Sequence, residues 1–191
     1  MRTAHSSPLA RHDSADIERI FAQCFEVSDR TLLKGGAAEP LYEPSVGEQG
    51  MNLLWYREDF FASALHESAH WCIAGAERRK QRDFGYWYAP EGRDPDAQRA
   101  FEAVEAAPQA LEWLFSVAAR YPFRLSADNV ESQSGQVLDN TAFADAVHRR
   151  AIAWQSGGLG ARAARFFDAL ASFYGWPGGL VGVRLLRESL R

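Results

Sequence analysis

The feature that most restricts the fold is an apolar stretch, residues 60–73, into which three ionisable side chains are set. Apolar residues recur there with the period of a helix, and we predict a helix from about residue 58 to beyond residue 73. His66, Glu67 and His70 keep the stretch short of the roughly 18 to 20 uninterrupted apolar residues of a membrane span. We therefore expect a soluble chain with no membrane partner, organised around this helix.

Two histidines on the predicted helix are spaced for metal binding. His66 and His70 are four residues apart, so both imidazoles project from one face and can reach one metal ion. Glu67 directly follows His66, which places it poorly as a ligand but well as an acid or base beside the metal. The HExxH pattern is only moderately specific, because a histidine on an apolar helical face is often a hydrogen-bonded core residue. The spacing favours a metal site and leaves the core interpretation open.

A metal ion held by two histidines needs a third protein ligand, and a carboxylate on a later helix is the best donor in this sequence. Glu102 and Glu105 are three residues apart and share a helical face, with Phe101 and Val104 beside them. Acids on an otherwise apolar face are unusual, although a solvated helix edge also carries them. We predict Glu105 as the ligand and Glu102 as its neighbour or substitute.

The composition indicates one folded domain in a reducing compartment. The 191 residues are 47% hydrophobic and 13% aromatic, which suits a chain that buries a large core without an oligomeric partner. We predict a monomer with a single domain over residues 14–191 and a mobile N-terminus over residues 1–13 that lacks a signal-peptide core. Cys24 and Cys72 lie in apolar surroundings and are interpreted as buried thiols, so the expected location is the cytoplasm.

The charge pattern does not favour nucleic acid as a partner. The formal net charge is −4, and the one basic cluster, residues 78–82, is either a surface for an acidic partner or a solvated helix end. Residues 128–131 carry two acids in a predicted loop that could face the site, but loops of this composition are usually turns. Neither segment is assigned a role in the chemistry.

Short apolar pieces separated by glycine and proline predict a small sheet over residues 31–56. Elsewhere the apolar period is helical, which gives an α+β fold that is mainly helical. Ser14 is the expected cap of the first helix, and Pro95 and Pro108 are expected to begin two successive helices. The predicted helices cover residues 14–25, 58 to beyond 73, 94–106, 108–120, 139–155 and 161–174, with a further strand at residues 83–88.

Longer blocks of sequence resemble the bacterial elongation factor P hydroxylase family. Around the two histidines the matching blocks are HESAHWCIAG (66–75), DFGYWY (83–88) and GRD (92–94). The resemblance extends upstream through LKG (33–35) and EP (39–40), and downstream through FE (101–102), VE (104–105), PQAL (108–111), WLF (113–115), YPF (121–123) and DN (128–129). It covers most of the chain and is far more specific than HExxH alone.

The resemblance implies a zincin-like α+β fold with the HExxH segment on a central helix. It also implies a metal-dependent monooxygenase that hydroxylates the β-lysyl-lysine side chain of elongation factor P, with molecular oxygen as co-substrate. The ligand set is similar to the two-histidine, one-carboxylate site of non-haem iron oxygenases, which His66, His70 and one of the glutamates match. Fe(II) is the implied metal, although the same ligands bind zinc readily.

Two other functions fit the short motif. In a zinc peptidase, Glu67 would activate a metal-bound water whose pKa is lowered to about 7. The long peptidase variant is excluded, because the places of its glycine and third histidine hold Ile73 and Ala76. A peptidase with glutamate as third ligand and a non-enzymatic helical metal-binding module remain as alternatives.

Overall fold

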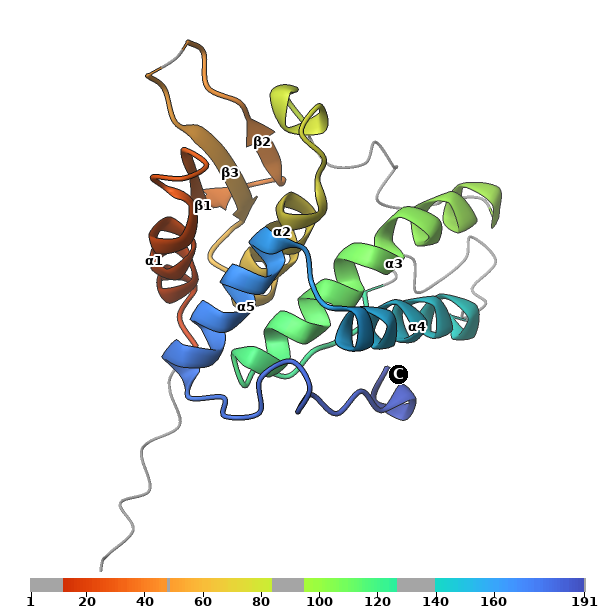
Figure 1. The fold of residues 1–191 in the computed structure, drawn as a ribbon. Coiled ribbons are helices and arrows are strands. Elements are labelled where there is room, and N and C mark those ends of the chain that lie inside the picture. The colour runs from red at the N-terminus through yellow and green to blue at the C-terminus, as the bar shows by residue number, and fades with distance from the viewer. Residues whose placement is uncertain (1–11, 48, 84–94, 127–139, 191) are drawn as a thin grey trace, which may run out of the picture.

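The structure is a computed structural model that describes residues 12–47, 49–83, 95–126 and 140–190 (Figure 1). These residues form five α-helices, three strands and two short 3₁₀ helices, so the predicted α+β class with a small sheet is confirmed. In chain order the elements are α1 (Ser14–Phe25), β1 (Thr31–Ala37), β2 (Leu41–Glu43), β3 (Asn52–Arg57), α2 (Phe61–Ile73), η1 (Arg78–Lys80), α3 (Pro95–Ala118), α4 (Thr141–Gly157), α5 (Ala161–Tyr174) and η2 (Arg187–Ser189).

The sheet lies beside α1 and leads directly into α2 (Figure 1). Strand β3 is central, parallel to β1 and antiparallel to β2. Glu18 of α1 ties the helix to the sheet, because its carboxylate accepts hydrogen bonds from the Gly35 amide at 2.8 Å and from the Tyr56 hydroxyl at 3.0 Å. A Cβ on Gly35 would lie 2.7 Å from the Tyr56 ring and from the Glu58 carbonyl oxygen, so this close approach requires glycine.

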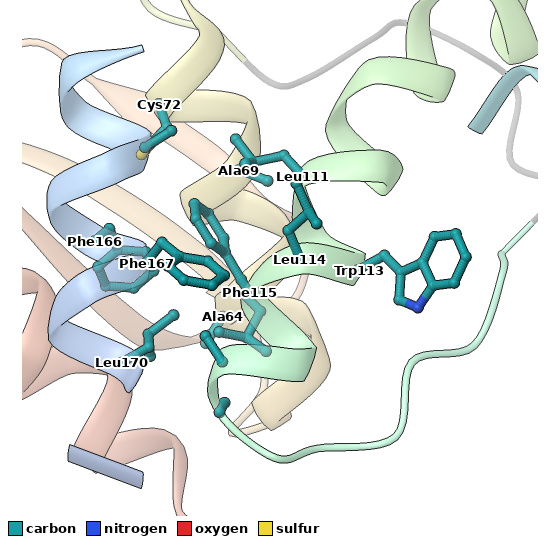
Figure 2. Packing of buried hydrophobic residues seen from close by; sticks show 14 of the residues in the cluster. Ala64, Ala69, Cys72, Leu111, Trp113, Leu114, Phe115, Phe166, Phe167 and Leu170 are labelled. Carbon is teal, nitrogen blue, oxygen red and sulfur yellow. The ribbon is translucent and has the colours of Figure 1, made fainter. Parts of the chain in front are cut away.

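Helix α2 runs through the centre of the molecule and packs against α1, α3, α5 and β3. Its apolar face carries Ala64, Ala69 and Cys72, which pack against α3 and α5 (Figure 2). The helix begins at Phe61 rather than near residue 58, and it ends at Ile73 rather than beyond it. The partners of this face in Figure 2 are Leu111, Leu114 and Phe115 from α3 and Phe166, Phe167 and Leu170 from α5.

Helix α3 corrects the prediction of two successive helices at residues 94–106 and 108–120. It is one helix of 24 residues with Pro108 inside it. An interior proline removes one backbone hydrogen bond and clashes with the preceding turn, at a cost of about 3 kcal/mol. The buried residues Phe101, Leu111 and Phe115 lie on both sides of the proline, and their burial outweighs that cost.

The start of the described chain is better anchored than predicted. Asp13, not Ser14, caps α1, because its carboxylate accepts a hydrogen bond from the Ala15 amide at 3.0 Å. His12 was expected in the mobile N-terminus, yet its Nε2 lies 2.9 Å from the Ala119 carbonyl oxygen and its ring stacks on Tyr174. Residues 1–11 of that segment lie outside the described residues.

The remaining helices agree with the periodicity. Helix α5 has the predicted bounds and ends at Tyr174. Gly175 caps it, and its φ of 68° is the left-handed conformation of a glycine cap. Helix α4 begins at Thr141, and its expected cap Asp139 lies outside the described residues. A strand was expected at residues 83–88. Asp83 forms an isolated β-bridge with Tyr42, and residues 84–88 lie outside the described residues. Among the helices that the structure describes, none is long and apolar enough to cross a membrane.

Candidate metal centre

The two histidines of α2 point at a common place. His66 and His70 lie one turn apart, with ring centroids 4.7 Å apart and an interplanar angle of 68°. Their Nε2 atoms are 3.0 Å apart, and both side chains are largely covered. Two imidazole lone pairs at that distance repel each other unless a proton or a metal ion lies between them. The arrangement of these nitrogens thus suits a shared cation.

Glu105 of α3 supplies the third group. Its two carboxylate oxygens lie 3.5 Å from His66 Nε2 and 3.2 Å from His70 Nε2, and the side chain is buried. The ligand atoms of the three residues all lie within 4.8 Å of one another. Two imidazole nitrogens and one carboxylate oxygen converge here from packed helices. This set of ligands fits a catalytic divalent metal ion, because three protein ligands leave further coordination positions of the metal open.

Glu102, the predicted substitute, is not part of this group in the described residues. It lies one turn nearer the start of α3, is half-buried, and accepts a hydrogen bond from the Gln98 amide at 3.0 Å. The packing of α3 on α2 therefore brings Glu105 to the histidines in preference to Glu102.

Glu112, which was not among the predicted site residues, lies on the other side of the His66 ring. Its Oε2 is 2.8 Å from His66 Nδ1, and the side chain is buried. The sequence did hold a signal, since Glu112 follows Glu105 by seven residues, which is two helical turns and the same helical face. A buried acid at that interval is expected to meet the same partner helix.

The acids around the histidines perturb each other's protonation in the metal-free protein. Burial alone would lower the pKa of His66, but the hydrogen bond to Glu112 and the nearby carboxylates outweigh it and raise that pKa to about 10. Burial would raise the pKa of Glu105, yet its hydrogen bond to His70 and the charges of both histidines lower it. Burial raises the pKa of Glu67, although the two histidines oppose that shift. The surroundings of His66 thus favour its positively charged form.

The end of α2 is fixed from α5. The Arg162 guanidinium donates hydrogen bonds to the carbonyl oxygens of Trp71 at 3.4 Å, Cys72 at 3.1 Å and Ala74 at 2.6 Å. A cation at these last carbonyls also opposes the negative end of the helix dipole. Arg162 therefore holds the C-terminal turn that directly follows His70.

The basic cluster at residues 78–82 is largely neutralised in the structure. Each of its four cations lies within ion-pair distance of an acid: Arg78 with Asp83, Arg79 with Asp29, Lys80 with Glu77 and Arg82 with Glu43. Such pairing weakens the field that the cluster offers to an acidic partner. The loop at residues 128–131 lies outside the described residues.

The chain is similar to proteins named as elongation factor P hydroxylases. Residues 20–181 match the protein family described as elongation factor P hydroxylase. A relative from Haemophilus influenzae, named elongation factor P lysine hydroxylase, is 45% identical over 163 residues, which cover 85% of this chain and 90% of the relative. The matched residues include both histidines, Glu105 and Glu112.

Proposed function

Because this chain belongs to the elongation factor P hydroxylase family, we propose that it hydroxylates a lysine side chain of elongation factor P. The observation that carries the proposal is the 45% identity over 85% of the chain to a relative of that name. The converging donors of His66, His70 and Glu105 support it, because they give the chain a site that suits metal-dependent oxygen chemistry.

We propose that His66, His70 and Glu105 hold Fe(II), with dioxygen as co-substrate. When bound, iron supplies the redox change that oxygen insertion requires and that zinc does not offer. His66 and His70 contribute uncharged nitrogen donors, so His66 must release its second proton before it can serve as a ligand. Glu105 contributes a negative charge from the facing helix. Because its side chain is buried next to the histidines, water screens this charge only weakly.

Glu67 is proposed as the catalytic acid or base. It directly follows His66 on α2, and burial raises the pKa of its carboxyl, so the group is suited to hold a proton beside the ligands. The zincin-like fold, the β-lysylated form of the substrate, the monomeric state and a single domain over residues 14–191 are parts of the same proposal. The free thiols of Cys24 and Cys72 suit the proposed cytoplasmic location.

The peptidase alternative uses the same ligands, so only a product assay separates it from the hydroxylase. β-Lysylated elongation factor P is incubated with the protein, Fe(II), air and a two-electron reductant, since one oxygen atom enters the product and the other leaves as water. Mass spectrometry should then show the modified lysine heavier by one oxygen atom, with the chain intact.

Three controls define the reaction. Anaerobic incubation, replacement of Fe(II) by Zn²⁺ and the His70→Ala variant should each abolish the gain in mass. A cleaved product would instead establish the peptidase. Substrate that returns with unchanged mass under every metal and reductant would refute the hydroxylase proposal and favour a metal-binding module.

A further inference from the structure

The His66 ring is held on both sides by one helix. Its Nε2 faces His70 and Glu105, while its Nδ1 lies 2.8 Å from Glu112 Oε2. Glu105 and Glu112 both belong to α3, two turns and about 10 Å apart along the helix axis. The ring therefore lies between two carboxylates, and the spacing of these carboxylates is fixed by a single helix.

Glu112 is buried among core residues of α3. Its neighbours in sequence, Leu111 and Trp113, are buried, and so is Leu114 (Figure 2). Within the described residues, His66 is the partner that the structure gives to the Glu112 carboxylate. A buried carboxylate is unfavourable unless it is hydrogen-bonded, so its presence in this layer needs a reason beyond packing.

We propose that Glu112 is a positioning residue of the metal centre. Its carboxylate accepts the Nδ1 proton of His66, which fixes the tautomer that leaves the Nε2 lone pair free and aims the ring at the metal. This inference rests on the proposed metal centre. A ligand histidine whose other nitrogen donates to a carboxylate is also a more basic ligand, and loss of such a partner typically costs about 10- to 100-fold in metal affinity.

Two variants of Glu112 separate its hydrogen bond from its bulk. Glu112→Gln keeps the shape and a neutral acceptor, whereas Glu112→Leu keeps the volume and removes the acceptor. Glu102→Gln is the matched control, because it removes an equal charge from the same helix outside the group of converging ligand atoms. Affinity for Co²⁺ and Zn²⁺ is measured by calorimetry on the full chain, with circular dichroism of the metal-free proteins to establish folding.

We expect Glu112→Leu to bind about 10- to 100-fold more weakly and Glu112→Gln to fall between it and the unaltered protein. Glu102→Gln should bind within about fivefold of the unaltered protein, because only a weak effect of its charge on the metal is expected. In the zinc-loaded, ¹⁵N-histidine-labelled protein, the His66 Nδ1 should carry a proton that exchanges slowly with water. That signal should be lost or exchange fast in Glu112→Leu, which a purely structural role of Glu112 would not cause.

Unchanged affinity and an unchanged Nδ1 proton in Glu112→Leu would overturn the proposal. If that variant does not fold, Glu112→Gln decides, because unaltered affinity there has the same meaning. Absence of metal binding in the unaltered protein would overturn the metal centre together with this role. These measurements do not depend on hydroxylation. If the effect of Glu112 is present but elongation factor P stays unmodified in the product assay described above, only the proposed reaction is refuted.

Discussion

Replacing Glu105 with glutamine tests the assignment of the third metal ligand. The change keeps the side-chain shape and removes one negative charge from a buried position, 3.5 Å and 3.2 Å from the two Nε2 atoms. A four-ligand structural zinc site is worth about 10–16 kcal/mol, or about 3 kcal/mol per ligand. The amide oxygen of glutamine can retain part of this binding free energy. We therefore expect the free energy of metal binding to weaken by about 2–3 kcal/mol, which is about 30- to 150-fold in affinity.

The matched comparison is Glu102→Gln, which removes the same charge one turn earlier on α3. Its carboxylate is half-buried and bonded to Gln98, so only a weak field effect on the metal is expected, less than about fivefold. Competition titration with Co²⁺ at fixed pH and ionic strength measures both variants. A larger loss in Glu102→Gln would transfer the ligand role to that residue, and small losses in both would place the metal elsewhere.

Two further predictions concern the scaffold. Burial is the main cause that raises the pKa of Tyr56 to about 12, whereas in the unfolded chain it titrates near its ordinary value of about 10. The unfolded state therefore loses this proton first, and about 2–3 kcal/mol of stability should disappear between about pH 10 and pH 12. Urea titrations at pH 9 and 11.5 should show a smaller decline in Tyr56→Phe, and an equal decline would refute the assignment. Arg162→Met should lower stability by about 1.5–3 kcal/mol, because three carbonyl oxygens at the end of α2 lose a charged donor, and an unchanged melting temperature would contradict that role.

Local signals were sufficient for most of the fold. The helices at residues 14–25 and 161–174 and the three strands follow from apolar period and from glycine and proline between them. The division of α3 at Pro108 was wrong, because the proline penalty is local whereas the burial that outweighs it comes from neighbouring helices. The cap at Asp13 was missed by one residue, since serine and aspartate are equally good caps.

The site was only partly predictable for a geometric reason. The spacing of His66 and His70 fixes their common face within one helix, so the sequence alone places them together. The choice between Glu102 and Glu105 depends on how α3 is rotated against α2, and helical periodicity within α3 cannot define that rotation. Glu112 was not predicted, although its interval of seven residues from Glu105 places both acids on the same face of α3.

The single helix that carries Glu105 and Glu112 also restricts how this chain can change in length. Each residue inserted between them would turn the part of α3 beyond it by about 100° and advance it by about 1.5 Å. One insertion would direct Glu112 away from His66, and one deletion would do so in the opposite sense. We therefore expect a library of random insertions and deletions to yield variants of unaltered metal affinity with changed length in surface turns, and none of unaltered affinity with changed length between residues 105 and 112.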